Sequence, residues 1–110
     1  MQMGLGDSTV PNIGSLLHAR LLNLPALTPS PAPAGYLGLA EQPGPISGSA
    51  FAAYDFGIDL AKLYSRADPD RDENQVHEGL RELEPTLAQM EKFMADGTIQ
   101  NFCSGTCNPE

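Results

Sequence analysis

The stretch of sequence that decides the expected fold is residues 1–25, which read MQMGLGDSTVPNIGSLLHARLLNLP. Residues 1–5 form a short apolar run that stops at Gly6 and Asp7. Such a run, bounded by turn residues, is typical of a buried strand, so we expect a strand over residues 1–5. The Gly-Asp pair then predicts a turn at the end of this strand.

The rest of this stretch predicts a helix over residues 14–23. The apolar stripe of this helix consists of Leu17, Leu21 and Leu24, with Leu16 and Ala19 beside it. Either Asn12 or Ser15 can cap its first turn, and Pro25 lies just past its end, where proline is common. We therefore expect the chain to run from a strand through a turn into an amphipathic helix.

A second strand is expected over residues 49–58, which read SAFAAYDFGI. These residues are small or aromatic and are bounded by glycines, as is typical of a strand. Tyr54 and Asp55 stand near its end. We expect them to finish the strand, and the alternative is that they line a substrate pocket.

A second helix is expected over residues 85–96. Pro85 suits a first-turn position, and Gly97 suits the position just past the last turn. Its apolar stripe consists of Leu87, Met90, Phe93 and Met94. We expect this stripe to pack against the core.

Between the first helix and the second strand, residues 25–48 are expected to form an irregular surface excursion. Six of the ten prolines lie between Pro25 and Pro45, and proline removes a backbone donor and fixes φ. The alternation of strands and helices around this excursion predicts an α/β fold with two parallel strands and two main helices. A parallel sheet needs cover on both faces, so two strands and two helices predict an incomplete domain, one edge of something larger.

The composition narrows the class of protein. The 110 residues carry a formal net charge of -8 with 14 acidic and 6 basic side chains, which argues against a nucleic-acid partner. No apolar run approaches the roughly 20 residues of a transmembrane helix, and no signal peptide is visible. We expect an acidic, loop-rich protein with no transmembrane segment.

Residues 1–25, with Gly-Asp-x-x-Val-Pro followed by a leucine-rich helix, resemble the region after the seventh strand of α/β-hydrolases. The likeness is closest to bacterial extracellular lipases and esterases. It implies that residues 1–110 are the C-terminal segment of one α/β-hydrolase domain and that residues 49–58 are the eighth strand. It also implies that Asp7 is the acid of a Ser-His-Asp triad and that His77, in an acidic loop over residues 65–79, is the base.

The resemblance also implies a missing partner. In this fold the triad follows the chain order serine, acid, histidine, and the chain contains no Gly-x-Ser-x-Gly. The nucleophile would therefore lie on a complementary N-terminal hydrolase segment or on another chain, acting on an ester or lipid substrate. The alternative is a non-enzymatic, acidic, secreted interaction module whose proline-rich arm wraps a larger partner.

Each site residue has a plainer interpretation. Asp7 is otherwise an ordinary turn aspartate. His18, the other histidine, stands inside the leucine-rich helix and is expected to be a packed or partly exposed helix residue. His77 is the better base because a polar loop after a strand can bring it to a nucleophile.

Two further clusters bear on ligands and localisation. Asp68, Asp70 and Asp72 resemble the start of a calcium loop, but the glycine and glutamate that an EF-hand requires are missing, so we expect no cofactor and leave loosely bound calcium as the alternative. In the tail, residues 101–110, Cys103 and Cys107 are expected to form a small disulfide loop rather than a zinc or redox site. A disulfide implies an oxidising compartment, either secreted or in the periplasm or cell envelope.

Overall fold

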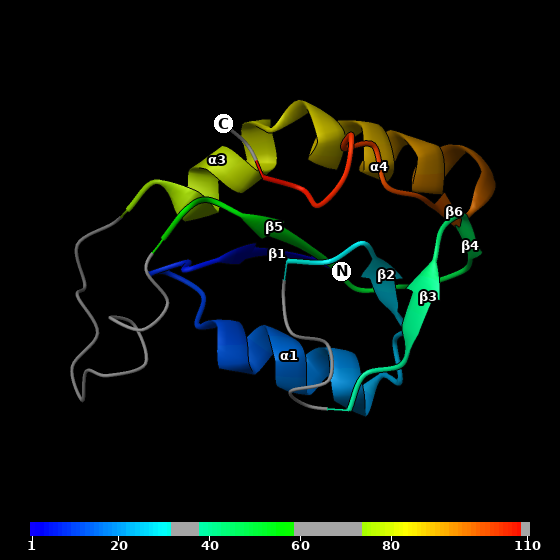
Figure 1. Ribbon diagram of the computed structural model, residues 1–110, viewed down its shortest axis with the longest axis horizontal. Helices are drawn as coiled ribbons and strands as arrows, with labels where there is room; N and C mark the ends of the chain where they lie inside the picture. The colour runs from blue at the N-terminus through cyan, green and yellow to red at the C-terminus, as the bar shows by residue number, and fades with distance from the viewer. Residues whose placement is uncertain (32–37, 59–73, 109–110) are drawn as a thin grey trace.

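The computed structural model describes residues 1–31, 38–58 and 74–108, and its centre is a pair of parallel strands (Figure 1). The helices of the described part are α1 (Asn12–Leu21), α3 (Val76–Glu82) and α4 (Glu84–Asp96). Its strands are β1 (Gln2–Leu5), β2 (Ala26–Thr28), β3 (Glu41–Pro43), β4 (Ile46–Ser47), β5 (Ala52–Asp55) and β6 (Thr98–Ile99). The result is a mixed α/β globule.

The two strands expected from the sequence pair with each other. β1 runs parallel to β5, with Gln2 opposite Ala52 and Leu5 opposite Asp55. Helix α1 lies on one face of this pair and helices α3 and α4 lie on the other (Figure 1). The parallel arrangement is confirmed, and both faces of the pair are covered.

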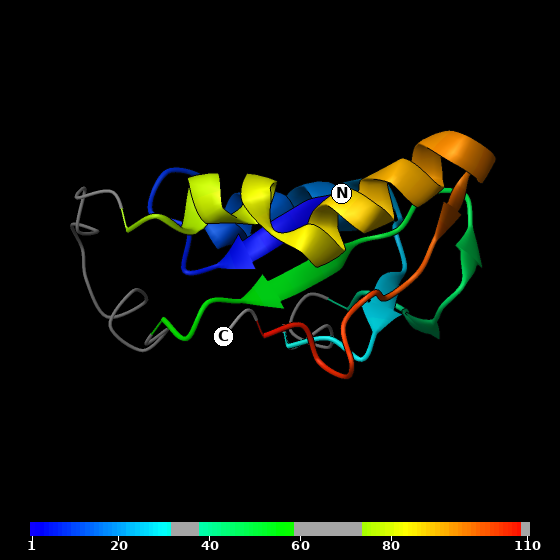
Figure 2. The ribbon, with the colours of Figure 1, turned by 90° about the horizontal axis from the view of Figure 1, so that it is seen from above.

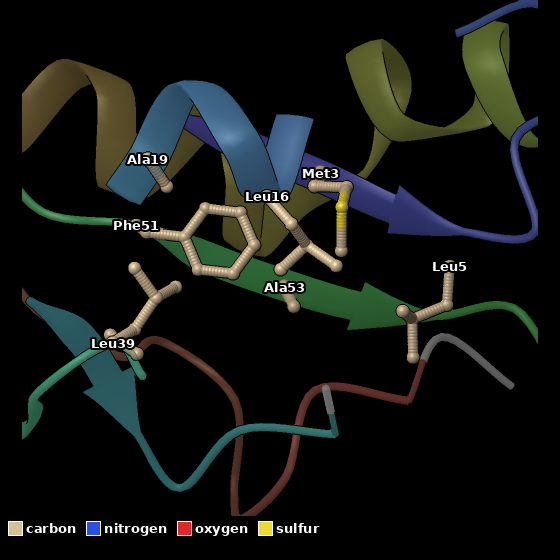
Figure 3. Close-up of a cluster of buried hydrophobic side chains, with 8 residues drawn as sticks. Met3, Leu5, Leu16, Ala19, Leu39, Phe51 and Ala53 are labelled. Atoms are coloured by element: carbon tan, nitrogen blue, oxygen red, sulfur yellow. The ribbon is translucent and has the colours of Figure 1, made fainter. Parts of the chain in front are cut away.

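Alternation along the strands builds a separate core on each face. The core on the α1 side consists of Met3, Leu5, Leu16, Ala19, Ala26, Leu39, Phe51 and Ala53 (Figure 3). The core on the other side consists of Leu27, Ile46, Ala50, Ala52, Tyr54, Ile99 and Cys107. Neighbouring residues of β5 therefore serve different cores, as the period of two requires.

The excursion over residues 25–48 is not confined to the surface, which corrects the expectation. Strands β2 and β3 form a short parallel pair, and Ala26 is bridged to Phe51 at the start of β5. Ala26, Leu27 and Ile46 are all buried. The prolines limit these strands to two or three residues but leave apolar residues between them free to join the core.

Of the leucine stripe expected for the first helix, Leu24 packs against the core, but Leu17 and Leu21 do not. α1 begins at Asn12, two residues earlier than expected, and buries Leu16 and Ala19. Leu17 is 46 % exposed and Leu21 is 80 % exposed. Within α1 itself, the residues placed beside the leucine stripe are therefore the ones that face the core.

The second helix forms as expected, but its apolar stripe does not pack. Proline stands in the first turn of α4, and Gly97 ends the helix in the left-handed conformation. The expected stripe is exposed, with Met94 at 78 %, whereas Thr86 and Gln89 are buried. The Thr86 hydroxyl lies 2.6 and 2.7 Å from the Leu80 and Leu83 carbonyl oxygens, so its single O–H has a partner without water.

Among the described residues, one edge of the central pair has no strand partner. Figure 2 shows β1 and β5 side by side, with the helices over β1 and the C-terminal tail on the β5 side. In the described ranges, β5 is the only strand that pairs with β1. Residues of β1 are largely buried, so the exposed apolar surface of the described part lies instead on the stripes of α1 and α4.

The C-terminal tail folds back along β5. Cys103 and Cys107 form a disulfide with an S–S distance of 2.04 Å, as expected from their spacing. The carbonyl oxygen of Cys107 accepts the backbone N–H of Asp55 at 2.8 Å. The disulfide loop thereby protects the end of β5.

Candidate active site

The turn after β1 places the carboxylate of Asp7 where the parallel strands end. Gly6 has a φ of +83°, and a Cβ there would lie 2.5 Å from Cβ of Ile58, so both the turn and its packing require glycine. Oδ1 of Asp7 accepts the backbone N–H groups of Thr9 and Val10, each at 2.8 Å. The carboxylate is thus held in place and its Oδ2 is left for another donor.

His77 stands on a helix and not in a loop, which corrects the expectation for residues 74–79; residues 65–73 of the predicted loop lie outside the described residues. Helix α3 begins at Val76 after Gln75, whose φ is 64°. A Cβ at Gly4 would lie only 2.5 Å from Cγ1 of Val76. Glycine in β1 therefore lets the start of α3, and with it His77, lie directly against the strand.

The structure joins the two predicted triad residues. Nδ1 of His77 lies 2.9 Å from Oδ2 of Asp7 across 70 positions of sequence. The Asp7 side chain is 5 % exposed and the His77 side chain 22 %. A carboxylate can only accept hydrogen bonds, so the proton of a neutral His77 ring is on Nδ1 and the lone pair is on Nε2.

Ser8 and Asn74 tie the acid turn to the histidine helix. Nδ2 of Asn74 donates to the Gly6 carbonyl at 2.7 Å, and the Ser8 hydroxyl donates to Oδ1 of Asn74 at 3.1 Å. The same hydroxyl accepts the Asn74 backbone N–H at 3.2 Å. Sequence reasoning did not single out this clamp, because its two sides lie 66 positions apart.

A third polar residue fixes the end of β1. Asn12 was one of two candidates, with Ser15, for the cap of α1, but the structure shows no side-chain cap there. Its Nδ2 donates to the Gly4 carbonyl and its Oδ1 accepts the Gly6 N–H, each at 2.7 Å. Both polar atoms of the buried amide thus help to set the turn that carries Asp7.

The structure does not bring His18 to this site. His18 lies on the exposed side of α1, as expected for a helix residue, while the carboxylate of Asp7 contacts His77. The dyad therefore pairs Asp7 with His77 alone of the two histidines.

Tyr54 lies near the end of β5, and its side chain is buried and does not line an open pocket. It is 1 % exposed, and burial raises the pKa of its hydroxyl to about 12 because the phenolate is the charged form. A cavity of about 270 Å³ lies between the start of β1 and α4, where Met1, Met90 and Phe93 contribute to its wall. Neither residue of the dyad lines it.

The described residues were compared with the requirements of a metal site and of a membrane-spanning helix. Within residues 1–31, 38–58 and 74–108, acidic, cysteine and histidine side chains form no group of three suited to a metal ion. Asp68, Asp70 and Asp72, the residues of the calcium alternative, lie outside those ranges. In the same part of the chain no helix has the length and apolar character needed to span a membrane.

The chain matches no protein-family model, no curated protein and no solved structure.

Proposed function

We propose that this chain contributes the acid and the base of a Ser-His-Asp triad to a serine hydrolase that cleaves esters. The single observation that carries the proposal is the 2.9 Å contact between Nδ1 of His77 and Oδ2 of Asp7. In such a triad, the carboxylate holds the imidazole in the tautomer whose Nε2 is free of a proton and stabilises the imidazolium that forms. The buried acid and half-covered histidine suit those two tasks.

The nucleophile would come from a complementary segment or chain. A serine hydroxyl is a weak nucleophile near neutral pH and needs an adjacent base. The open edge of β1 and the exposed stripes of α1 and α4 support a larger assembly, since an unpaired parallel edge favours another strand. Bacterial lipases and esterases remain the class that the resemblance of residues 1–25 favours, with an ester or lipid as substrate.

The disulfide supports an oxidising location. Disulfides persist in secreted and periplasmic proteins and are rare in the cytosol. We therefore propose a location outside the cytoplasm, either secreted or in the cell envelope.

The interaction-module alternative receives less support. In that proposal a proline-rich arm wraps a partner, but the described parts of residues 25–48 pack Ala26, Leu27, Leu39 and Ile46 into the protein's own cores. A buried acid–histidine pair also has no evident use in a passive module.

The test is hydrolysis of a p-nitrophenyl ester by this chain combined with the polypeptide encoded immediately upstream. His77→Ala should abolish most turnover. Asp7→Asn should slow it severely; a comparable change in a serine protease lowers kcat by about 10⁴-fold. The matched control is His18→Ala, which should leave turnover nearly unchanged. Near-normal turnover by folded His77→Ala would end the triad assignment.

A further inference from the structure

Arg81 contacts the nitrogen of His77 that the dyad leaves available. Its Nη2 lies 2.8 Å from Nε2 of His77, since the two residues are four positions apart on α3 and share a face. A guanidinium has only N–H donors and no acceptor. Nε2 therefore directs its lone pair at Arg81.

Arg81 contacts a second partner through its other terminal nitrogen. Its Nη1 lies 3.3 Å from Oε1 of Glu78, and the two side chains are 63 % and 54 % exposed. Exposed pairs of this kind are weak and readily exchanged. The guanidinium can thus rest on the imidazole or move fully onto the Glu78 carboxylate.

We propose that Arg81 is a latch that covers the base nitrogen of His77 and moves to Glu78 before His77 acts. A general base must come within about 2.6–3.2 Å of the proton that it abstracts. A donor seated 2.8 Å from Nε2 already occupies that place. The catalytic consequence rests on the proposed function, whereas the contact itself is testable on this chain alone.

The test uses diethyl pyrocarbonate, which transfers an ethoxycarbonyl group to an imidazole nitrogen that has a lone pair. At pH 8, where free imidazole is neutral, peptide mapping by mass spectrometry gives the rates for the two histidines separately. His18 is exposed on α1 and serves as the internal reference. The ratio of the His77 rate to the His18 rate reports how well Nε2 is covered.

The two partners of the latch should change this ratio in opposite directions. Arg81→Met removes the donor and should raise the ratio about fivefold, the factor that one net hydrogen bond contributes. Glu78→Gln removes the competing carboxylate, so Arg81 should stay on His77 and the ratio should fall. The matched control is Lys92→Met, which loses the same charge on α4 and should leave the ratio unchanged.

An unchanged ratio in Arg81→Met, or a shift of the same sign in both variants, would overturn the latch. Nitrogen-15 NMR of the imidazole rings separates that failure from failure of the proposed function. If the Nδ1–H tautomer of His77 persists while the ratio does not respond, the latch is wrong and the dyad stands. If wild-type His77 lacks that tautomer, the dyad itself is refuted.

Discussion

Alanine at Gly4 should push helix α3 away from β1 and separate the dyad. The added Cβ would lie 2.5 Å from Cγ1 of Val76 and 3.3 Å from Cε2 of Phe56. Carbon atoms pack favourably at about 3.5–4.0 Å, so Val76 has to retreat by about 1 Å. Val76 is buried and β-branched, which restricts its rotamers, so the start of the helix must move with it.

The cost follows from overpacking, which typically destabilises a core by about 1–3 kcal/mol. For a chain of this size, each kcal/mol lowers Tm by roughly 4–8 °C. His77 directly follows Val76, so the same displacement should stretch its 2.9 Å contact with Asp7 beyond the usual upper limit of about 3.2 Å. Urea unfolding measures the stability, and the imidazole tautomer of His77 reports on the contact.

Two further variants test whether the clash with Val76 is the cause. Val76→Ala in the Gly4→Ala background removes the clashing methyl, so the double variant should lose less stability than the sum of the single variants by about 1 kcal/mol. Gly14→Ala is the matched control, because a Cβ there meets nothing within 4 Å and alanine favours a helix interior. Wild-type stability of Gly4→Ala, or additive effects in the double variant, would refute the reasoning.

Three other predictions concern the surface, the tail and the core. The exposed apolar stripes of α1 and α4 predict that the isolated chain self-associates. Leu21→Lys with Met94→Lys should reduce this association in sedimentation velocity while changing stability by less than about 0.5 kcal/mol, because both side chains are more than three-quarters exposed. Reduction of the Cys103–Cys107 disulfide should lower the free energy of unfolding by about 2 kcal/mol, the low end for a short loop, as urea unfolding with and without reductant measures. The raised pKa of Tyr54, about 12 against an ordinary 10, favours the neutral form in the folded state, so stability should hold below pH 10 and fall between pH 10 and 12.

Each of these has an outcome that would contradict it. Unchanged association of the double lysine variant would remove the helix stripes as contact surfaces. Equal unfolding curves with and without reductant would mean that the disulfide constrains nothing. Tyr54→Phe should abolish the fall at high pH, and an unaltered fall would assign it to other groups.

The sequence predicted those parts of the fold that depend on local signals. Short apolar runs and flanking glycines located β1 and β5, and Pro85 with Gly97 located α4. The prediction of which helix residues are buried was wrong because burial there depends on partners far away in the sequence. Gln89 is buried because it donates to the Gln100 carbonyl and accepts from Gln2, each at 3.0 Å, and no pattern within the helix shows this.

The sequence predicted the two principal residues of the candidate site, but not the residues that hold them in place. Asp7 was identified by its turn and its neighbours in sequence, and His77 by its position after the second strand. The loop expected around His77 is a helix. Gly79 inside α3 lowers helix propensity, and a Cβ there would lie 3.1 Å from Cε1 of Phe56, a distant contact that the local sequence does not show. The Ser8–Asn74 clamp has no local signature, because its hydrogen bonds exist only once the ends of both segments have met.

The side-chain amide of Asn12 sets a limit on how this sheet can grow. The Met1 carbonyl bonds to Ala52, so by alternation the Gln2 carbonyl and the Gly4 N–H point to the open edge. The next two groups on that edge, the Gly4 carbonyl and the Gly6 N–H, are already bonded to Asn12, which takes the place of one peptide unit of a neighbouring strand. A further strand can therefore pair with the beginning of β1 but must diverge from it at Gly4. The gap left by this divergence lies beside the turn that bears Asp7.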